Sequence, residues 1–231
     1  MLSCLSPDSN VTTFSLNINT PQNEIAVRMN IMIEYLTGGN LLRRFTFMWL
    51  LSFSIFSLAW VASYLVLPQR VLRGKLPSTW LFGEDVDVLS TFLKIFITNF
   101  MVGGIVFSLG NLFRVGNVPL GYVAIWGQIL IFGLLKGTNS FIYPYETMFA
   151  SFIGFLRTGL WEFTAYILMT CSTIDFAIYR QESWLSNKVT KIKQWSDLKL
   201  SKAEKTIYTL GALILLLSAY LETLAIFNVI P

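Results

Sequence analysis

Histidine is absent from this chain of 231 residues, and its two cysteines, Cys4 and Cys171, lie far apart in the sequence. Without histidine, the commonest general base and the commonest metal ligand are both missing. The two cysteines form no CxxC or zinc-like spacing, so the sequence implies no disulfide framework and no zinc site. The absence of histidine also excludes the Ser-His and Cys-His pairs of nucleophilic enzymes.

Charged residues are also scarce. They make up 13% of the chain, against 54% hydrophobic residues, and the mean hydropathy is +0.60. A soluble domain has about 25% charged residues, so about half of the usual solvating surface is missing. The composition therefore predicts a chain that folds in a lipid bilayer and has no large domain outside it.

The sequence also lacks the short motifs that mark common enzymes. It contains no Walker A loop, no GxSxG nucleophile elbow and no HExxH zinc motif. Its few basic residues are explained by membrane topology, so a nucleic-acid role has no support. We therefore predict that the protein is not an enzyme and that it uses no cofactor, metal or nucleic acid.

Apolar windows recur along the chain at the length that a bilayer requires. A hydrocarbon core about 30 Å thick needs about 20 mostly apolar helical residues. The windows predict an all-α, polytopic helical membrane protein with about five transmembrane spans, residues 41–231, after a polar cytoplasmic N-terminal tail, residues 1–40. The predicted spans are about 45–67, 88–112, 115–135, 145–179 and 206–230.

The fourth window is too long for one perpendicular crossing. A helix from Thr147 to Tyr179 would be about 50 Å long at about 1.5 Å per residue. The window carries Arg157 and Glu162 on either side of Gly159, so we predict a broken or re-entrant helix near residues 157–159. Irregular backbone at membrane depth needs protein or a cavity around it, and we therefore expect the break to be buried among the other spans.

Basic residues predict the orientation through the positive-inside rule. With the N-terminus in the cytoplasm, most of them fall on the inner side, and only Arg70, Arg73, Lys75 and Lys136 fall outside. We therefore predict a cytoplasmic N-terminus and an external C-terminus. The basic segment 180–205 is either an amphipathic helix on the cytoplasmic leaflet or a solvated connector.

Four further expectations concern single positions or short patterns. Ser201 and Glu204 have the spacing of a capping box at the start of the last span. Gly133 and Gly137 have the spacing of a small-residue face for close helix contact. Asp175 is expected at the cytoplasmic interface beside Arg180, and Glu222 is expected to snorkel outward or to pair internally.

Ionisable residues inside the spans are the candidate site residues, because each one is costly in lipid unless it is paired. Arg157 and Glu162 are the leading pair, which a break at Gly159 would bring together. Glu162 otherwise reaches Lys94 or Asn99 on the second span. The cluster is either a buried polar network that fixes helix packing or a site that binds or moves a substrate.

The residues Gly159-Leu160-Trp161-Glu162-Phe163-Thr164-Ala165 match the G-x-x-E-x-x-A core of the stage II sporulation protein M family. The sequence Leu41–Phe45 before the first span, Phe96–Asn99 in the second and the glycine-rich third span also resemble that family, over about residues 40–230. The chain departs from the pattern where Arg157-Thr158 stand in place of Pro-His, and where Trp126-Gly127 stand in place of Asn-Gly.

This resemblance implies a multi-pass protein of a prokaryotic cell membrane. The sporulation members are non-enzymatic anchors for a peptidoglycan-degrading complex, so the leading hypothesis is a membrane scaffold or assembly factor. Its partners would be the lipid bilayer and membrane or envelope proteins, with a homo-oligomer as a further option. The alternative is a permease-like subunit that moves a small solute or lipid through a site around Glu162, and a third option is an enzyme that acts on lipid.

Overall fold

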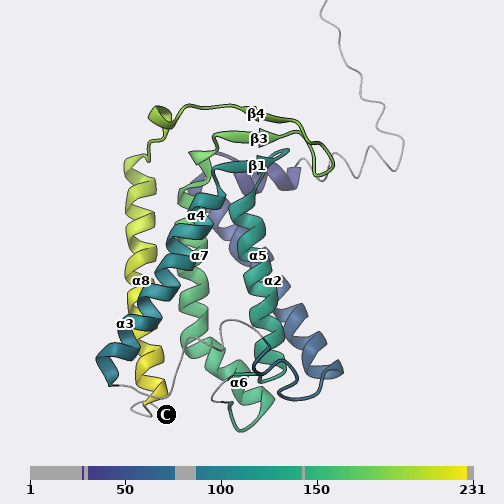
Figure 1. Ribbon diagram of the computed structural model, residues 1–231, viewed down its shortest axis with the longest axis vertical. Helices are drawn as coiled ribbons and strands as arrows, with labels where there is room; N and C mark the ends of the chain where they lie inside the picture. The colour runs from purple at the N-terminus through teal and green to yellow at the C-terminus, as the bar shows by residue number, and fades with distance from the viewer. Residues whose placement is uncertain (1–27, 29–30, 76–86, 142–143, 228–231) are drawn as a thin grey trace, which may run out of the picture.

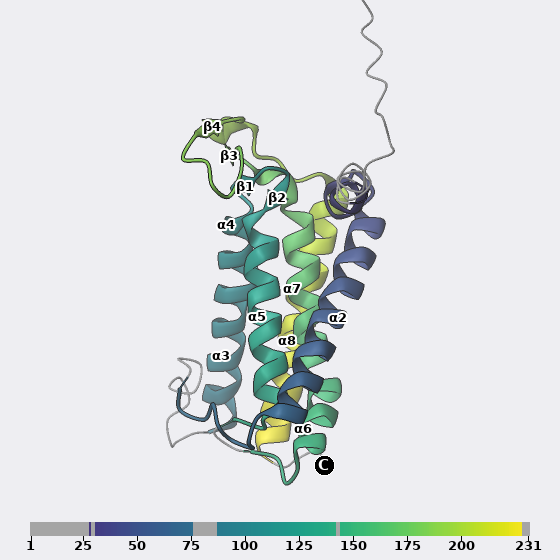
Figure 2. The same cartoon turned by 90° about the vertical axis from the view of Figure 1, so that its right-hand side faces the viewer.

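The computed structural model describes residues 28, 31–75, 87–141 and 144–227. Four of its helices are long and apolar enough to cross a membrane: Leu41–Val66, Val88–Gly110, Leu120–Gly137 and Lys202–Ile226. These helices run side by side in an elongated bundle with a small sheet at one end (Figures 1 and 2). A helical membrane protein is thus confirmed, while residues 1–27 of the predicted tail lie outside the described residues.

The first span is α2 (Leu41–Val66), which begins at Asn40 and ends just before Pro68. The Asn40 side chain accepts a hydrogen bond from the backbone N–H of Arg43 at 3.1 Å, which is the usual way to satisfy a free helix N-terminus. Residues 31–37, assigned to the tail from the sequence, are helical. This N-terminal segment lies across the bundle axis at the start of α2 (Figures 1 and 2).

The second span is a continuous helix made of three segments. The third span follows it. The three segments are α3 (Val88–Asn99), the π-helical turn η2 (Phe100–Val106) and α4 (Phe107–Gly110), and the third span is α5 (Leu120–Gly137). The third span therefore begins five residues later than the predicted start at 115, because strands occupy the chain before Leu120.

The fourth window is helical from α6 (Met148–Gly154) through the π-helical turn η3 (Phe155–Gly159) to α7 (Leu160–Ser172). The broken or re-entrant helix predicted near 157–159 is therefore not what the backbone forms there. Gly154 and Leu160, which flank the turn, both have right-handed helical dihedrals. A π-turn widens the helix by one residue and leaves the backbone continuous. The helix also ends at Ser172, well before the predicted limit at 179.

An all-α fold does not describe the end of the bundle at which α2 begins. Four short strands pair there in the order β2-β1-β3-β4 (Figure 1). They are β1 (Phe113–Val115), β2 (Val118–Pro119), β3 (Tyr179–Gln181) and β4 (Val189–Lys191). We call this sheet and its loops, residues 113–119 and 179–197, the cap.

The cap joins two connections that are distant in the sequence. β1 pairs in parallel with β3, with Arg114 opposite Arg180, and antiparallel with β2 through a turn at Gly116. Gly116 has a φ of +59°, a conformation that glycine adopts without strain. The segment 180–205 thus forms strands and a short 3-10 helix, η5 (Trp195–Asp197), so the amphipathic-helix interpretation is wrong. Val189 and Thr190 are β-branched and favour the extended backbone of β4.

The last span, α8 (Lys202–Ile226), begins with the predicted capping box. The backbone N–H of Glu204 donates to Ser201 Oγ at 3.2 Å, and the backbone N–H of Ser201 donates to Glu204 Oε2 at 2.8 Å. This reciprocal pair satisfies two of the N–H groups that a helix start leaves free. The predicted start of the last helix is therefore confirmed.

Aromatic rings and glycines pack the bundle interior. Phe56 of α2 stacks on Phe155 of η3 with ring centroids 3.9 Å apart. Gly133 and Gly137 of α5 lie against the backbone of α2, where an added Cβ at Gly133 would meet Ala59 Cβ and the Phe56 carbonyl oxygen. The small-residue face predicted from the sequence is confirmed, and it allows α2 and α5 to approach closely.

We predict that Gly133→Val destabilises the bundle by about 2 kcal/mol, because the added atoms overpack the α2–α5 contact. The control is Gly127→Val in the same helix, where nothing lies within 4 Å of an added Cβ. That change should stay within about 0.5 kcal/mol. Reversible unfolding of the purified protein in mixed detergent micelles measures both, and equal effects would contradict the close helix contact.

Candidate functional site

Glu162 lies on α7 just after the π-helical turn η3, and its side chain is buried, with 6% of the residue exposed. The Tyr166 hydroxyl, one helical turn further on, donates a hydrogen bond to Glu162 Oε1 at 2.5 Å. Hydrogen bonds from a hydroxyl to a carboxylate are this short when they are charge-assisted. Glu162 is thus buried, as the sequence analysis expected for an ionisable residue of this helix.

Two further charged side chains interact electrostatically with Glu162. They are Lys136, at the end of α5, and Glu222, in the last turns of α8. We call these three residues, Lys136, Glu162 and Glu222, the charged core. It contains two carboxyl groups and one ammonium group, contributed by three different helices. Lys136 therefore offsets part of the acidic charge that burial makes costly.

Aromatic rings cover the Lys136 ammonium. Its Nζ lies 4.3 Å from the centroid of the Phe141 ring and 5.2 Å from that of Tyr145. Asn139 holds this loop in place, because its side-chain amide donates to the Tyr145 carbonyl at 2.7 Å and accepts from the Tyr145 N–H at 2.9 Å. Burial raises the pKa of the Tyr145 phenol, and the nearby Glu222 adds to the rise. Phe141 and Tyr145 thus shield the Lys136 ammonium.

The other predicted site residues lie apart from Glu162. Arg157 is exposed and has the Tyr145 phenol as an electrostatic neighbour. Gly159 is buried inside η3 against the Phe155 ring. Lys94 is exposed on α3, and Asn99 is half-buried at the end of that helix. The structure therefore brings Glu162 together with Lys136 and Glu222 rather than with the predicted partners.

Sequence reasoning missed Lys136 as a site residue, since it was assigned to the external loop by the orientation rule. One signal was available. Lys136 and Glu222 lie near the C-terminal ends of the third and the last predicted spans, which the sequence predicts to run in the same direction. Opposite charges at matching depths on two such spans indicate that the helices pair them inside the bundle.

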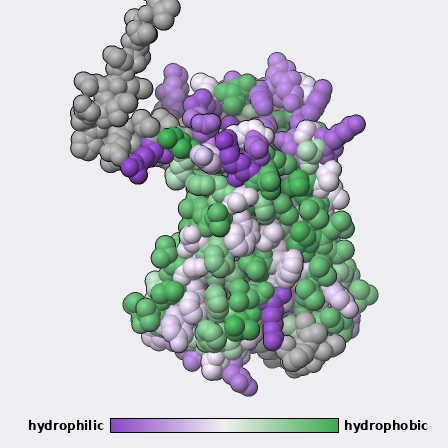
Figure 3. All heavy atoms as spheres, turned by 180° about the vertical axis from the view of Figure 1, so that it is seen from behind, coloured by the Kyte–Doolittle hydropathy of each residue, from purple (hydrophilic) through white to green (hydrophobic). Residues whose placement is uncertain are grey.

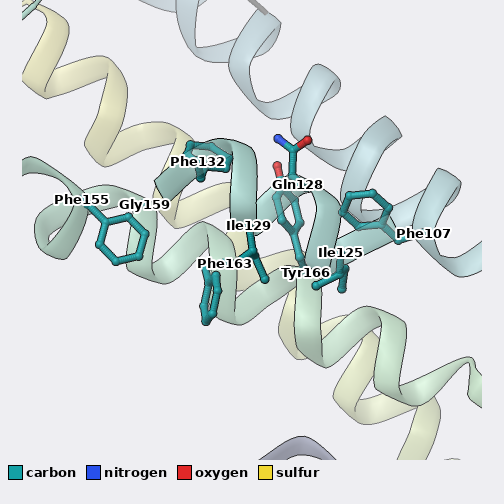
Figure 4. Close-up of a pocket in the computed structure, with 9 residues that line it drawn as sticks. All are labelled: Phe107, Ile125, Gln128, Ile129, Phe132, Phe155, Gly159, Phe163 and Tyr166. Carbon is teal, nitrogen blue, oxygen red and sulfur yellow. The ribbon is translucent and has the colours of Figure 1, made fainter. Parts of the chain in front are cut away.

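A small cavity of about 10 Å³ lies beside Tyr166, the hydrogen-bond partner of Glu162, and is lined by α4, α5, η3 and α7. Most of the lining is aromatic or aliphatic, and Gln128 and Tyr166 contribute polar side chains (Figure 4). A cavity of this size holds about one water molecule. The arrangement can hold a proton or a water molecule beside Tyr166, and the cavity is too small for a larger solute.

A second polar cluster, which we call the Arg44 cluster, lies at the cap end of the bundle. Arg44 is 2% exposed, and its guanidinium donates to the carbonyls of Gly38 at 2.9 Å and Cys171 at 3.0 Å. Asp175 lies 3.5 Å from Arg44 Nη2 and 3.7 Å from Arg114 Nη2. Burial lowers the pKa of Arg114, and Asp175 opposes that shift. The Asp175 carboxylate thus pairs with Arg44 and Arg114 rather than with the predicted neighbour Arg180.

The described residues contain no group of three histidine, cysteine, aspartate or glutamate side chains that could hold a metal ion. The comparisons with protein-family models, with curated proteins and with solved structures found no match for this chain.

We predict that Lys136→Met destabilises the protein by about 3 kcal/mol, because the buried Glu162 carboxyl group and the partly buried Glu222 lose a nearby cation. Adding Glu222→Gln should restore part of the loss, since one of those carboxyl groups is then neutral. The control, Lys94→Met, removes an exposed lysine of α3 and should have little effect. Unfolding free energies in detergent test the set, and purely additive changes at positions 136 and 222 would show that the two residues are not coupled.

Proposed function

We propose that this chain is a non-enzymatic multi-pass membrane scaffold or assembly factor that holds partner proteins at the cap. The supporting observation is a group of apolar side chains exposed on the β3–β4 hairpin and the loop after it. Leu185 is 97% exposed and Trp184 is 61% exposed. Val189, Ile192 and Trp195 are exposed nearby in the sequence. Exposed apolar groups on an extramembrane sheet are typical of interaction surfaces.

The surroundings of these side chains favour a protein partner. Polar side chains gather at the cap end, whereas apolar side chains cover most of the bundle flank (Figure 3). The hairpin therefore lies outside the apolar belt that lipid would explain. β4 is an edge strand whose residues are all exposed, and an edge strand offers unpaired backbone groups to another chain. Lys191, the last residue of this strand, and Lys193, which follows it, favour an acidic partner surface.

The proposal includes five spans and a cytoplasmic cap. The continuous helix from Met148 to Ser172 is about 37 Å long at about 1.5 Å per residue, which is enough to cross the bilayer. It runs beside α8 along the bundle (Figures 1 and 2). With this helix as the fourth span, the N-terminal segment and the cap share one end, and the described C-terminal residues lie at the other. The basic residues of the cap favour a cytoplasmic position for that end.

The scaffold hypothesis is also supported by the resemblance to the stage II sporulation protein M family, which covers the Gly159–Ala165 segment. In this chain, that segment includes the end of the π-helical turn and the buried Glu162. The same segment positions α7 against its neighbours, so its role here is to hold the helices in register.

We predict that the double variant Trp184→Ala, Leu185→Ala loses at least tenfold of its co-purifying partner, because exposed aromatic anchors dominate such interfaces. The matched control is Trp161→Ala, Leu58→Ala, which shortens an exposed tryptophan and leucine on the bundle flank. Quantitative mass spectrometry after cross-linking in intact membranes measures recovery. The bound partner should also resist protease added outside intact cells.

Recovery of the same partners with both double variants, or of the protein alone from gently solubilised membranes, would overturn the scaffold proposal. Digestion of the partner by external protease would overturn the cytoplasmic position of the cap.

A permease-like role is the second candidate, and the charged core is the observation that favours it. Glu162, its Tyr166 partner and the adjoining water-sized cavity provide groups that can bind a proton at membrane depth. A subunit driven by an ion gradient would use them for coupling, with the solute or lipid moving beside them.

If this second function is correct, proteoliposomes containing the protein should dissipate an imposed pH gradient, and Glu162→Gln should abolish the flux while the protein still folds. Fluorescence of a pH-sensitive dye trapped in the vesicles reports the flux. Lys94→Gln, on the exposed face of α3, is the control and should keep it. No flux from the parent protein would exclude this function.

A further inference from the structure

A groove of about 380 Å³ lies between the N-terminal segment, residues 31–37, and the first turns of α2. It is at the same end of the bundle as the cap (Figure 1). Its apolar walls come from Tyr35, Leu42, Phe47 and Leu50, and Arg43 is its charged lining residue. A groove with apolar walls and one guanidinium is suited to an amphiphilic ligand, which has an apolar chain and a polar headgroup.

The N-terminal segment has the features of a helix that lies in the membrane interface. It runs across the bundle axis rather than along it (Figures 1 and 2). Ile31, Met32 and Tyr35 on this segment are exposed, and Leu36 is buried against the bundle. Apolar side chains on such a helix are stabilised at the boundary between headgroups and acyl chains. The groove below the segment therefore lies at headgroup depth.

Arg43 packs against the N-terminal segment, and one of its donors has no hydrogen-bond partner among the described residues. Its guanidinium lies over the Tyr35 ring, 4.8 Å from the centroid. Its Nε is buried and has no hydrogen-bond partner among the described residues. Gly38 allows this position, since an added Cβ there would collide with Arg43 Nη2. A buried donor without a partner is rare in proteins, and the residue that carries it lines the groove.

The neighbouring Arg44 differs from Arg43 in its hydrogen bonding. Arg44 uses Nε, Nη1 and Nη2 in hydrogen bonds to backbone carbonyls inside the protein. The Nε of Arg43, which lies about 100° away round the helix, has no such acceptor among the described residues. The first turn of α2 also contains no acidic residue, so the positive end of the helix dipole is not neutralised there. Both features favour a negatively charged ligand.

We propose that this groove binds an anionic phospholipid, with the headgroup phosphate on the Arg43 guanidinium and an acyl chain along Phe47 and Leu50. A phosphate supplies acceptors that match the fork of guanidinium donors. The acyl chain continues from the groove along the apolar flank of α2, which the bilayer surrounds. The proposal depends on the membrane location of α2 and does not depend on the scaffold function.

Native mass spectrometry of the delipidated full-length protein in detergent tests this site. The three probes are dioleoyl phosphatidylglycerol, dioleoyl phosphatidylcholine and inorganic phosphate. The parent protein should bind phosphatidylglycerol most tightly. Arg43→Gln should weaken that binding about tenfold, because a charge-assisted pair is lost. Lys199→Gln removes an exposed lysine at the same end of the bundle and should change the affinity less than twofold.

A second variant tests the apolar half of the groove. Leu50 is 56% exposed, so Leu50→Gln should fold normally and weaken phosphatidylglycerol binding about threefold, through lost acyl contact. Equal binding of phosphatidylglycerol by the parent and Arg43→Gln proteins would overturn the proposal. Inorganic phosphate that displaces the lipid at equal concentration would show a site for free phosphate instead, and equal affinity for phosphatidylcholine would exclude selection for an anionic headgroup.

Discussion

The buried guanidinium of Arg44 is the interaction on which the cap end of the structure depends. It lies where α7 ends, and it donates to the free carbonyl of Cys171 and to that of Gly38 after the N-terminal segment. A cation at a helix C-terminus also interacts favourably with the helix dipole. Through Asp175, the same group is linked to Arg114 in β1. One side chain thus fixes α2, α7, the N-terminal segment and the first strand of the cap relative to one another.

The same need to satisfy backbone groups away from water explains how the π-helical turns survive at membrane depth. A π-turn displaces carbonyl groups from the regular helical pattern, and lipid offers no donor in exchange. In both turns, α8 supplies the donor. The Tyr208 hydroxyl donates to the Gly104 carbonyl in η2 at 2.9 Å, and Ser218 Oγ donates to the Thr158 carbonyl in η3 at 3.1 Å. The last helix, α8, therefore stabilises the irregular backbone of two other helices.

The features that could be predicted from the sequence depend on local patterns. The apolar windows, the capping box at Ser201 and the glycine face at Gly133 each involve residues less than one span apart, whereas the break predicted near residues 157–159 is a continuous π-helical turn. The parallel pairing of β1 with β3 joins residues more than sixty positions apart, and strands of three residues carry little periodicity of their own. The partners of Glu162 were missed for a related reason, since only the packing of three helices determines which charges share one depth.

The position of the charged core helps to decide between a rigid scaffold and a permease whose helices move. Glu162 lies one turn after Thr158 on α7, and Glu222 lies one turn after Ser218 on α8, so both carboxyl groups flank the hydrogen bond that stabilises η3. Lys136 lies one residue before Gly137, which packs on the backbone of α2 at Trp60. Any movement that exposed the carboxyl groups to a solute would separate these same contacts. Because the groups that a permease would have to move are next to the contacts that hold the helices together, the packing favours a rigid core that supports the cap.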